Sequence, residues 1–173
     1  AGMSHKDPSR IAWDSQVRAA AESRGARLLV LAGVVFHSYM VAIEFSHGAY
    51  SHRAPVILAL VIMAVAGTLL VAPWPDRVPP TLVTWGSAAV IGISNLLALV
   101  PIRGASEWPG WSGWSAGASM FLAALLLLRQ RMAEAVVGCV GLVAAVAAWA
   151  ALSGRSPGLV LSFTIGHIIT FMF

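Results

Sequence analysis

The chain has 173 residues, of which 58% are hydrophobic and only 10% are charged. A soluble domain of this size cannot bury so much apolar surface, because its helices need a polar face toward water. The composition therefore excludes an ordinary soluble protein and predicts an integral membrane protein. The net charge of +4 is small, and no basic and aromatic surface accompanies it, so nucleic acid is not an expected partner.

Residues 1–27 form a polar, basic segment ahead of the first apolar run. Ala1-Gly2 is set aside as a remnant of expression. Asp7-Pro8 has the pattern of a helix N-cap followed by proline in the first turn, and Gly25 is a candidate end for a helix over about 8–24. The weak apolar side of this segment predicts either a short amphipathic helix on the membrane surface or a disordered lead.

Six apolar segments follow, and a helix needs about 20 such residues to cross about 30 Å of hydrocarbon. Short connections with Gly, Pro or Arg separate them, so neighbouring helices should run antiparallel. The predicted fold is all-α: a polytopic bundle of about six transmembrane helices with short loops over residues 28–173. The predicted spans are 28–46, 54–73, 81–101, 112–128, 133–152 and 157–173.

Basic residues fix the expected orientation, because short cytoplasmic loops are enriched in Lys and Arg. The bias of Arg over Lys indicates a GC-rich bacterial genome, so the cytoplasmic membrane is the expected location, with both termini inside. Phe173 follows the last apolar run without a basic flank, which predicts that the chain is the membrane part of a longer protein. The predicted inner residues are Lys6, Arg10, Arg18, Arg24, Arg27, Arg77, Arg129 and Arg131; the predicted outer ones are Arg53, Arg103 and Arg155.

Polar groups within spans are the default functional candidates of a membrane protein, and His37, Glu44, Asn95 and His167 are the ones we single out. His37 and His167 each lie about 13 Å deep in their spans, so two imidazoles could share one depth. Such a pair can ligate haem, relay a proton or make a structural polar contact, and the last is favoured. Glu44 should lie near the outer boundary, hydrated or paired with Arg53.

Two histidines of the first outer loop, His47 and His52, offer a candidate zinc, copper or pH-sensing site. Their spacing matches no strong metal motif. No cofactor is otherwise expected, and the chain carries no phosphate loop, nucleophile elbow or paired zinc-ligand motif, so it is not predicted to be an enzyme.

Small residues four apart predict close helix packing. Gly113 and Gly117 form one such pair, and Ala88 and Gly92 form another. These pairs indicate packing faces of the bundle rather than a chemical site.

One stretch resembles a known family. The segment Trp111-Ser112-Gly113-Trp114-Ser115-Ala116-Gly117-Ala118, the turn Arg129-Gln130-Arg131 and the following Ala133-Glu134-Ala135 are similar to the N-terminal membrane region of two-component sensor histidine kinases of GC-rich Gram-positive bacteria. The resemblance covers about residues 108–150. It implies a homodimer that signals to a response regulator through a cytoplasmic domain absent from this chain. No kinase motif is present, so no catalytic residue is transferred.

Three functions remain open. The leading hypothesis is a sensor and anchor module in which a stimulus shifts helix packing and the sixth span passes that shift to a cytoplasmic domain. The alternatives are a small transporter or transporter subunit, with a path along His37, Asn95 or His167, and a membrane protein that binds haem or metal. The lipid bilayer is the expected partner in each case.

Overall fold

The computed structural model describes residues 8–75, 78–103 and 113–154, and the single positions 156, 158 and 165. The described chain folds into five α-helices. They are α1 (Pro8–Ser46), α2 (Arg53–Leu70), α3 (Thr81–Leu99), α4 (Trp114–Leu128) and α5 (Met132–Leu152). The all-helical bundle predicted from the sequence is confirmed at this level.

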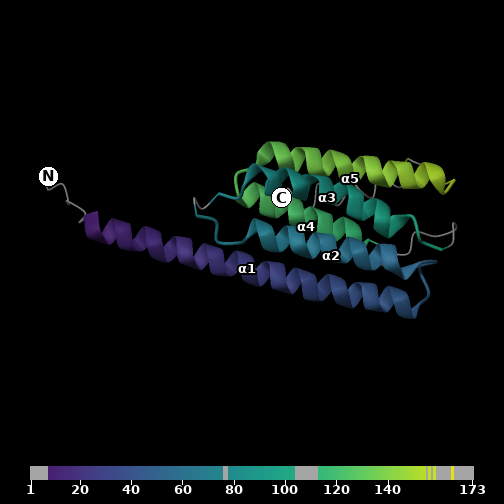
Figure 1. Ribbon diagram of the computed structural model, residues 1–173, viewed down its shortest axis with the longest axis horizontal. Helices are drawn as coiled ribbons and strands as arrows, with labels where there is room; N and C mark the ends of the chain where they lie inside the picture. The colour runs from purple at the N-terminus through teal and green to yellow at the C-terminus, as the bar shows by residue number, and fades with distance from the viewer. Residues whose placement is uncertain are drawn as a thin grey trace.

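Helix α1 is longer than expected. It runs without a break over 39 residues, so it is about 58 Å long and extends past the rest of the bundle at its N-terminal end (Figure 1). The prediction that Gly25 ends a separate helix is therefore wrong. A glycine costs a helix interior only about 1 kcal/mol relative to alanine, and termination usually needs a left-handed residue. The glycines that adopt positive φ in the described chain are Gly48 and Gly154.

The helices alternate in direction, as the short connections predict (Figure 1). The α1–α2 loop and the C-terminal end of α3 lie at one end of the bundle, and the α2–α3 and α4–α5 connections lie at the other. Consecutive helices of the described chain are therefore antiparallel.

Four helical segments are long and apolar enough to cross a membrane: Ala21–Ser46, Arg53–Leu70, Thr81–Leu99 and Met132–Leu152. Helix α4 is also apolar, but its 15 residues span only about 22 Å. The predicted sixth span, 157–173, lies outside the described residues apart from Gly158 and Ile165. A membrane protein with several apolar helices is therefore supported, while the number six stays a prediction.

Helix α3 lies at the centre and packs closely on α5. A Cβ placed on Gly92 would lie 3.5 Å from the backbone oxygen of Gly141, so the two helices approach backbone to backbone at this point. A Cβ on Gly138 would lie 2.6 Å from the Cδ1 atom of Ile91 and 3.5 Å from the Cα atom of Ala88. The predicted packing pair Ala88 and Gly92 thus faces Gly138 and Gly141 of α5. These two glycines were not predicted from the sequence to be packing residues.

Large apolar side chains cover the outside of the bundle. Leu28, Val35 and Phe36 of α1 are each more than half exposed, and so are Leu82 of α3 and Val140 of α5. In water such a surface would aggregate, whereas in a bilayer it faces lipid. The buried core instead contains small and aliphatic residues together with a few polar ones.

Candidate functional site

The loop at the C-terminal end of α1 is tied to the chain that leaves α3. The backbone N–H of Ser51 donates to the Pro101 carbonyl at 2.7 Å, and that of Arg103 donates to the Ala49 carbonyl at 2.8 Å. This pairing makes an antiparallel bridge between Tyr50 and Ile102. We call this end of the molecule the bridged end. Because side chains alternate along extended backbone, Tyr50 points inward and is buried while Ser51 beside it is exposed.

A chain of hydrogen bonds runs through the buried side of the bridged end. The indole N–H of Trp114, at the start of α4, donates to the Tyr50 hydroxyl at 2.9 Å. The Tyr50 hydroxyl in turn donates to Oε2 of Glu44, in the last turn of α1. All three side chains are buried. Burial first, and the contact with Glu44 second, raise the pKa of Tyr50 above its ordinary value, so the phenol keeps its proton and remains a donor.

Glu44 is the acceptor at the end of this chain, and its second oxygen is unsatisfied. The residue is only 2% exposed, and Oε1 finds no hydrogen-bond partner among the described residues. An unmatched polar atom in such a place costs about 1–3 kcal/mol. Glu44 therefore has one buried oxygen that remains available as an acceptor among the described residues.

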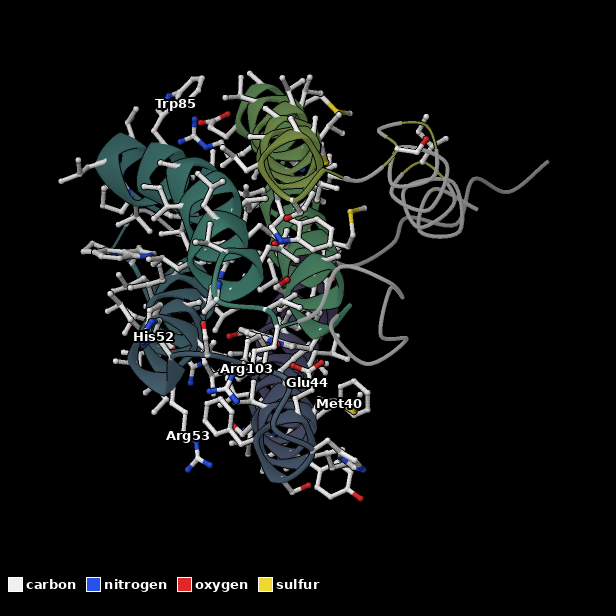
Figure 2. The ribbon with its side chains drawn as sticks, turned by 90° about the vertical axis from the view of Figure 1, so that its right-hand side faces the viewer. Met40, Glu44, His52, Arg53, Trp85 and Arg103 are labelled. Carbon is white, nitrogen blue, oxygen red and sulfur yellow. The ribbon has the colours of Figure 1, made fainter. Side chains whose placement is uncertain are left out.

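The expectation that Glu44 is hydrated or paired with Arg53 is wrong. The last turn of α1 directs the carboxylate toward Tyr50, inside the bundle. The Arg53 guanidinium instead lies over the Phe45 ring, 5.3 Å from its centroid, in a cation–π arrangement. Figure 2 shows Glu44 and Arg53 from the bridged end.

A second buried polar cluster joins α3 to α4. The amide of Asn95 donates to the Ile91 carbonyl at 2.7 Å and to the Ser119 hydroxyl, which itself donates to the Ser115 carbonyl at 2.8 Å. Asn95 Oδ1 and Ser115 Oγ have no partner in the described chain. Because Ser115 follows Trp114, this cluster and the Glu44 cluster share the first turn of α4.

His37 lies on α1 two turns before Glu44, against α4. Its Nδ1–H donates to the Gly33 carbonyl at 2.7 Å, and its Nε2 faces Gly117, where an added Cβ would lie 3.5 Å away. The imidazole and Trp114 rings are 6.5 Å apart. His167, its predicted partner, lies outside the described residues, so the haem hypothesis stays a prediction.

The loop histidines lie apart from the buried clusters. His47 donates from Nδ1 to the Ile43 carbonyl at 2.9 Å on the exposed side of α1, and His52 is exposed just before α2. No hydrogen bond or ring contact joins the two imidazoles in the part of the chain that the structure describes. Within the same residues, no group of three or more His, Cys, Asp or Glu side chains could hold a metal ion.

The opposite end holds a simpler contact. Glu134 is buried in the first turn of α5, where it accepts a 2.9 Å hydrogen bond from the Thr84 hydroxyl and lies 3.8 Å from the Arg131 guanidinium. This carboxylate is thus satisfied, unlike that of Glu44. Gly113, the other predicted packing residue, precedes α4 as its N-cap.

Sequence reasoning missed Tyr50, Trp114 and Ser115. Tyr50 falls in a loop and Trp114 at a predicted span end, where an interfacial position explains them without any partner. Ser119 donates back to its own helix, as a helical serine commonly does, but it also accepts from Asn95. The spacing of Ser115 and Ser119, four residues apart on one face, is the signal that points to a polar stripe.

Comparison with known proteins identifies a family but no activity. Residues 23–173 match the family described as Domain of unknown function (DUF8320). The match covers most of the chain, so the chain belongs to this family. No curated protein and no solved structure gives a significant match.

Proposed function

We propose that this member of the DUF8320 family is a membrane-embedded sensing and anchoring module that transmits a stimulus by moving α1 against the other helices. The observation that carries the proposal is the continuity of α1. One helix joins the unsatisfied carboxylate of Glu44 at the bridged end to the region beyond the opposite end. A rigid rod of this kind passes a small displacement along its whole length.

The packing of α1 supports this role. Among the described helices α1 contacts only α2 and α4, whereas α3 packs on α2, α4 and α5. Most of its apolar surface faces outward, since only 17% of its membrane-spanning window is buried. Among the five described helices, α1 is therefore the one whose displacement breaks the fewest contacts.

A packing defect lies under α1. A cavity of about 30 Å³ between α1, α2 and α4 is lined by Gly33, His37, Met63, Gly67 and Phe121, among others. A volume of this size admits about one water molecule, but water needs two or more polar partners, and His37 is the single polar residue in the lining. The cavity therefore marks a place where α1 is packed less tightly against α2 and α4.

The bridged end is the proposed input. Glu44 belongs to α1, Tyr50 to the loop and Trp114 to α4, so any change at the carboxylate alters the contact between α1 and the body formed by α2–α5. The resemblance to sensor histidine kinases supplies the proposed output, a cytoplasmic signalling domain joined to this module. That part of the proposal rests on the sequence resemblance alone.

Distances between spin labels test the proposed mobility. In a Cys139→Ala background, one pair of labels at Val35→Cys and Val140→Cys reports on α1 against α5. The control pair, Val61→Cys and Val140→Cys, lies within the α2–α5 body, and all three positions are exposed. In lipid nanodiscs we expect a broad or two-peaked distance distribution for the first pair and a narrow one for the second. Equally narrow distributions would overturn the proposal.

A further inference from the structure

We propose that the groove between α2 and α3 at the bridged end binds an anionic phospholipid, with an acyl chain in the groove and the phosphate near His52, Arg53 and Arg103. The inference does not depend on the proposed movement of α1. It assigns a ligand to a surface that lies on the other side of the bridge from Glu44.

The groove has the size and lining of an acyl-chain site. Its volume is about 300 Å³, against about 30 Å³ for one molecule of liquid water, so it admits a segment of chain and not only solvent. Its lining is almost entirely apolar. The residues that form it are Ser51, His52, Pro55, Leu96, Leu97, Val100 and Pro101.

The groove opens toward lipid at headgroup depth. It lies between the first turn of α2 and the last turn of α3, which are the ends of two membrane-spanning helices. Leu96 is 38% exposed and Val100 is 61% exposed. An occupant that continues from this groove into the bilayer needs a long apolar part and a polar end at the boundary, as a phospholipid has.

Two arginines lie next to groove residues in the chain: Arg53 follows His52, and Arg103 comes two residues after Pro101. Arg53 and Arg103 are exposed, and no ion pair to either is found among the described residues. The bridge places Arg103 on the same side of the extended backbone as Pro101, which lines the groove, because residues two apart on extended backbone point the same way. Figure 2 shows His52, Arg53 and Arg103 together on the bridged end.

The charge pattern selects an anionic headgroup. Two guanidinium groups attract the phosphate, while they repel the quaternary ammonium of a choline lipid. Among the described residues, Glu44 is the acidic residue at this end, and it is buried and bonded to Tyr50 rather than to either arginine. Phosphatidylglycerol should therefore bind more tightly than phosphatidylcholine with the same acyl chains.

Thermal unfolding of the full chain in detergent micelles tests the proposal, with dioleoyl phosphatidylglycerol or dioleoyl phosphatidylcholine added in increasing amounts. We expect phosphatidylglycerol to raise the unfolding temperature at lower concentrations than phosphatidylcholine. In the double variant Arg53→Gln/Arg103→Gln this preference should fall by about fivefold for each arginine removed. Leu96→Trp, which fills the groove, should weaken stabilisation by both lipids.

A matched control removes the same charge elsewhere. Arg24→Gln/Arg27→Gln neutralises two exposed arginines of α1, remote from the groove, and should keep the full preference for phosphatidylglycerol. Free glycerol phosphate should not stabilise the protein, since it lacks the acyl chain. Equal effects of the two lipids on the wild type, loss of the preference in the control variant, or full stabilisation by glycerol phosphate would each overturn the inference.

Discussion

Tyr50 links two helices from the loop between α1 and α2, because its hydroxyl accepts a hydrogen bond from α4 and donates one to α1. Its hydroxyl receives the Trp114 N–H and satisfies one oxygen of Glu44. Removing the hydroxyl therefore leaves two buried groups without partners, whereas removing the Trp114 N–H leaves none, since the Tyr50 oxygen can still donate. The two deletions therefore lower the free energy of unfolding by different amounts, although both remove the hydrogen bond between Trp114 and Tyr50.

We predict that Tyr50→Phe destabilises the protein by about 2–4 kcal/mol, because an unpartnered buried group costs about 1–3 kcal/mol and two such groups are left. Thermal unfolding in one detergent, followed by circular dichroism, measures the loss. Tyr39→Phe is the matched control, because Tyr39 is 63% exposed and its substitution removes a hydroxyl without leaving a buried group unpaired. An equal loss of stability for Tyr50→Phe and Tyr39→Phe would contradict the hydrogen-bond chain.

The raised pKa of Tyr50 predicts a loss of stability in alkali. The folded protein holds the phenolic proton more tightly than the unfolded chain, whose ordinary value is 10.0. This contribution is present in full below about pH 10 and is lost as the pH rises further toward the folded value. The unfolding temperature should therefore drop above about pH 10 in the wild type. In Tyr50→Phe the unfolding temperature should drop less than in the wild type. A drop as large as that of the wild type would contradict the prediction.

For the individual helices, hydropathy located α2 and α3 but placed their C-terminal ends two or three residues too late. The spans predicted at 54–73 and 81–101 end in the structure at Leu70 and Leu99. The extra residues are apolar, yet Pro73 and Pro101 have no N–H to extend the helical ladder. The partners of Glu44 could not be predicted in this way, because the loop position of Tyr50 depends on a bridge to residues about 50 positions away in the chain.

The contact between α3 and α5 gives a prediction at the same scale. Gly138→Ala should destabilise the protein by about 1–3 kcal/mol, because the new methyl group displaces Ile91. The double variant Gly138→Ala/Ile91→Val should recover part of the loss, since it removes the Cδ1 atom that clashes. Gly86→Ala, where a Cβ meets nothing within 4 Å, should instead stabilise α3 slightly. Unfolding temperatures of the four proteins decide, and no recovery in the double variant would contradict the packing.

At the scale of the whole molecule, the proposed function requires communication between the two ends of the bundle. Composition alone predicts a membrane bundle, and the alternation of helices follows from the short connections. The continuity of α1 past Gly25 could not be predicted, since a single glycine neither forbids nor requires a break. That continuity makes the lead segment part of the same rod as Glu44, which lies about 30 Å from Arg24 along the helix.

The most direct test perturbs one end and measures the other. Spin labels at Arg24→Cys and Val136→Cys report the distance between α1 and α5 at the end opposite Glu44, again in the Cys139→Ala background. Glu44→Gln should shift the distribution of this distance, because it changes the group that holds α1 to Tyr50. His52→Gln, at the bridged end but exposed and outside α1, should leave it unchanged. An unaltered distribution in Glu44→Gln would contradict transmission along α1.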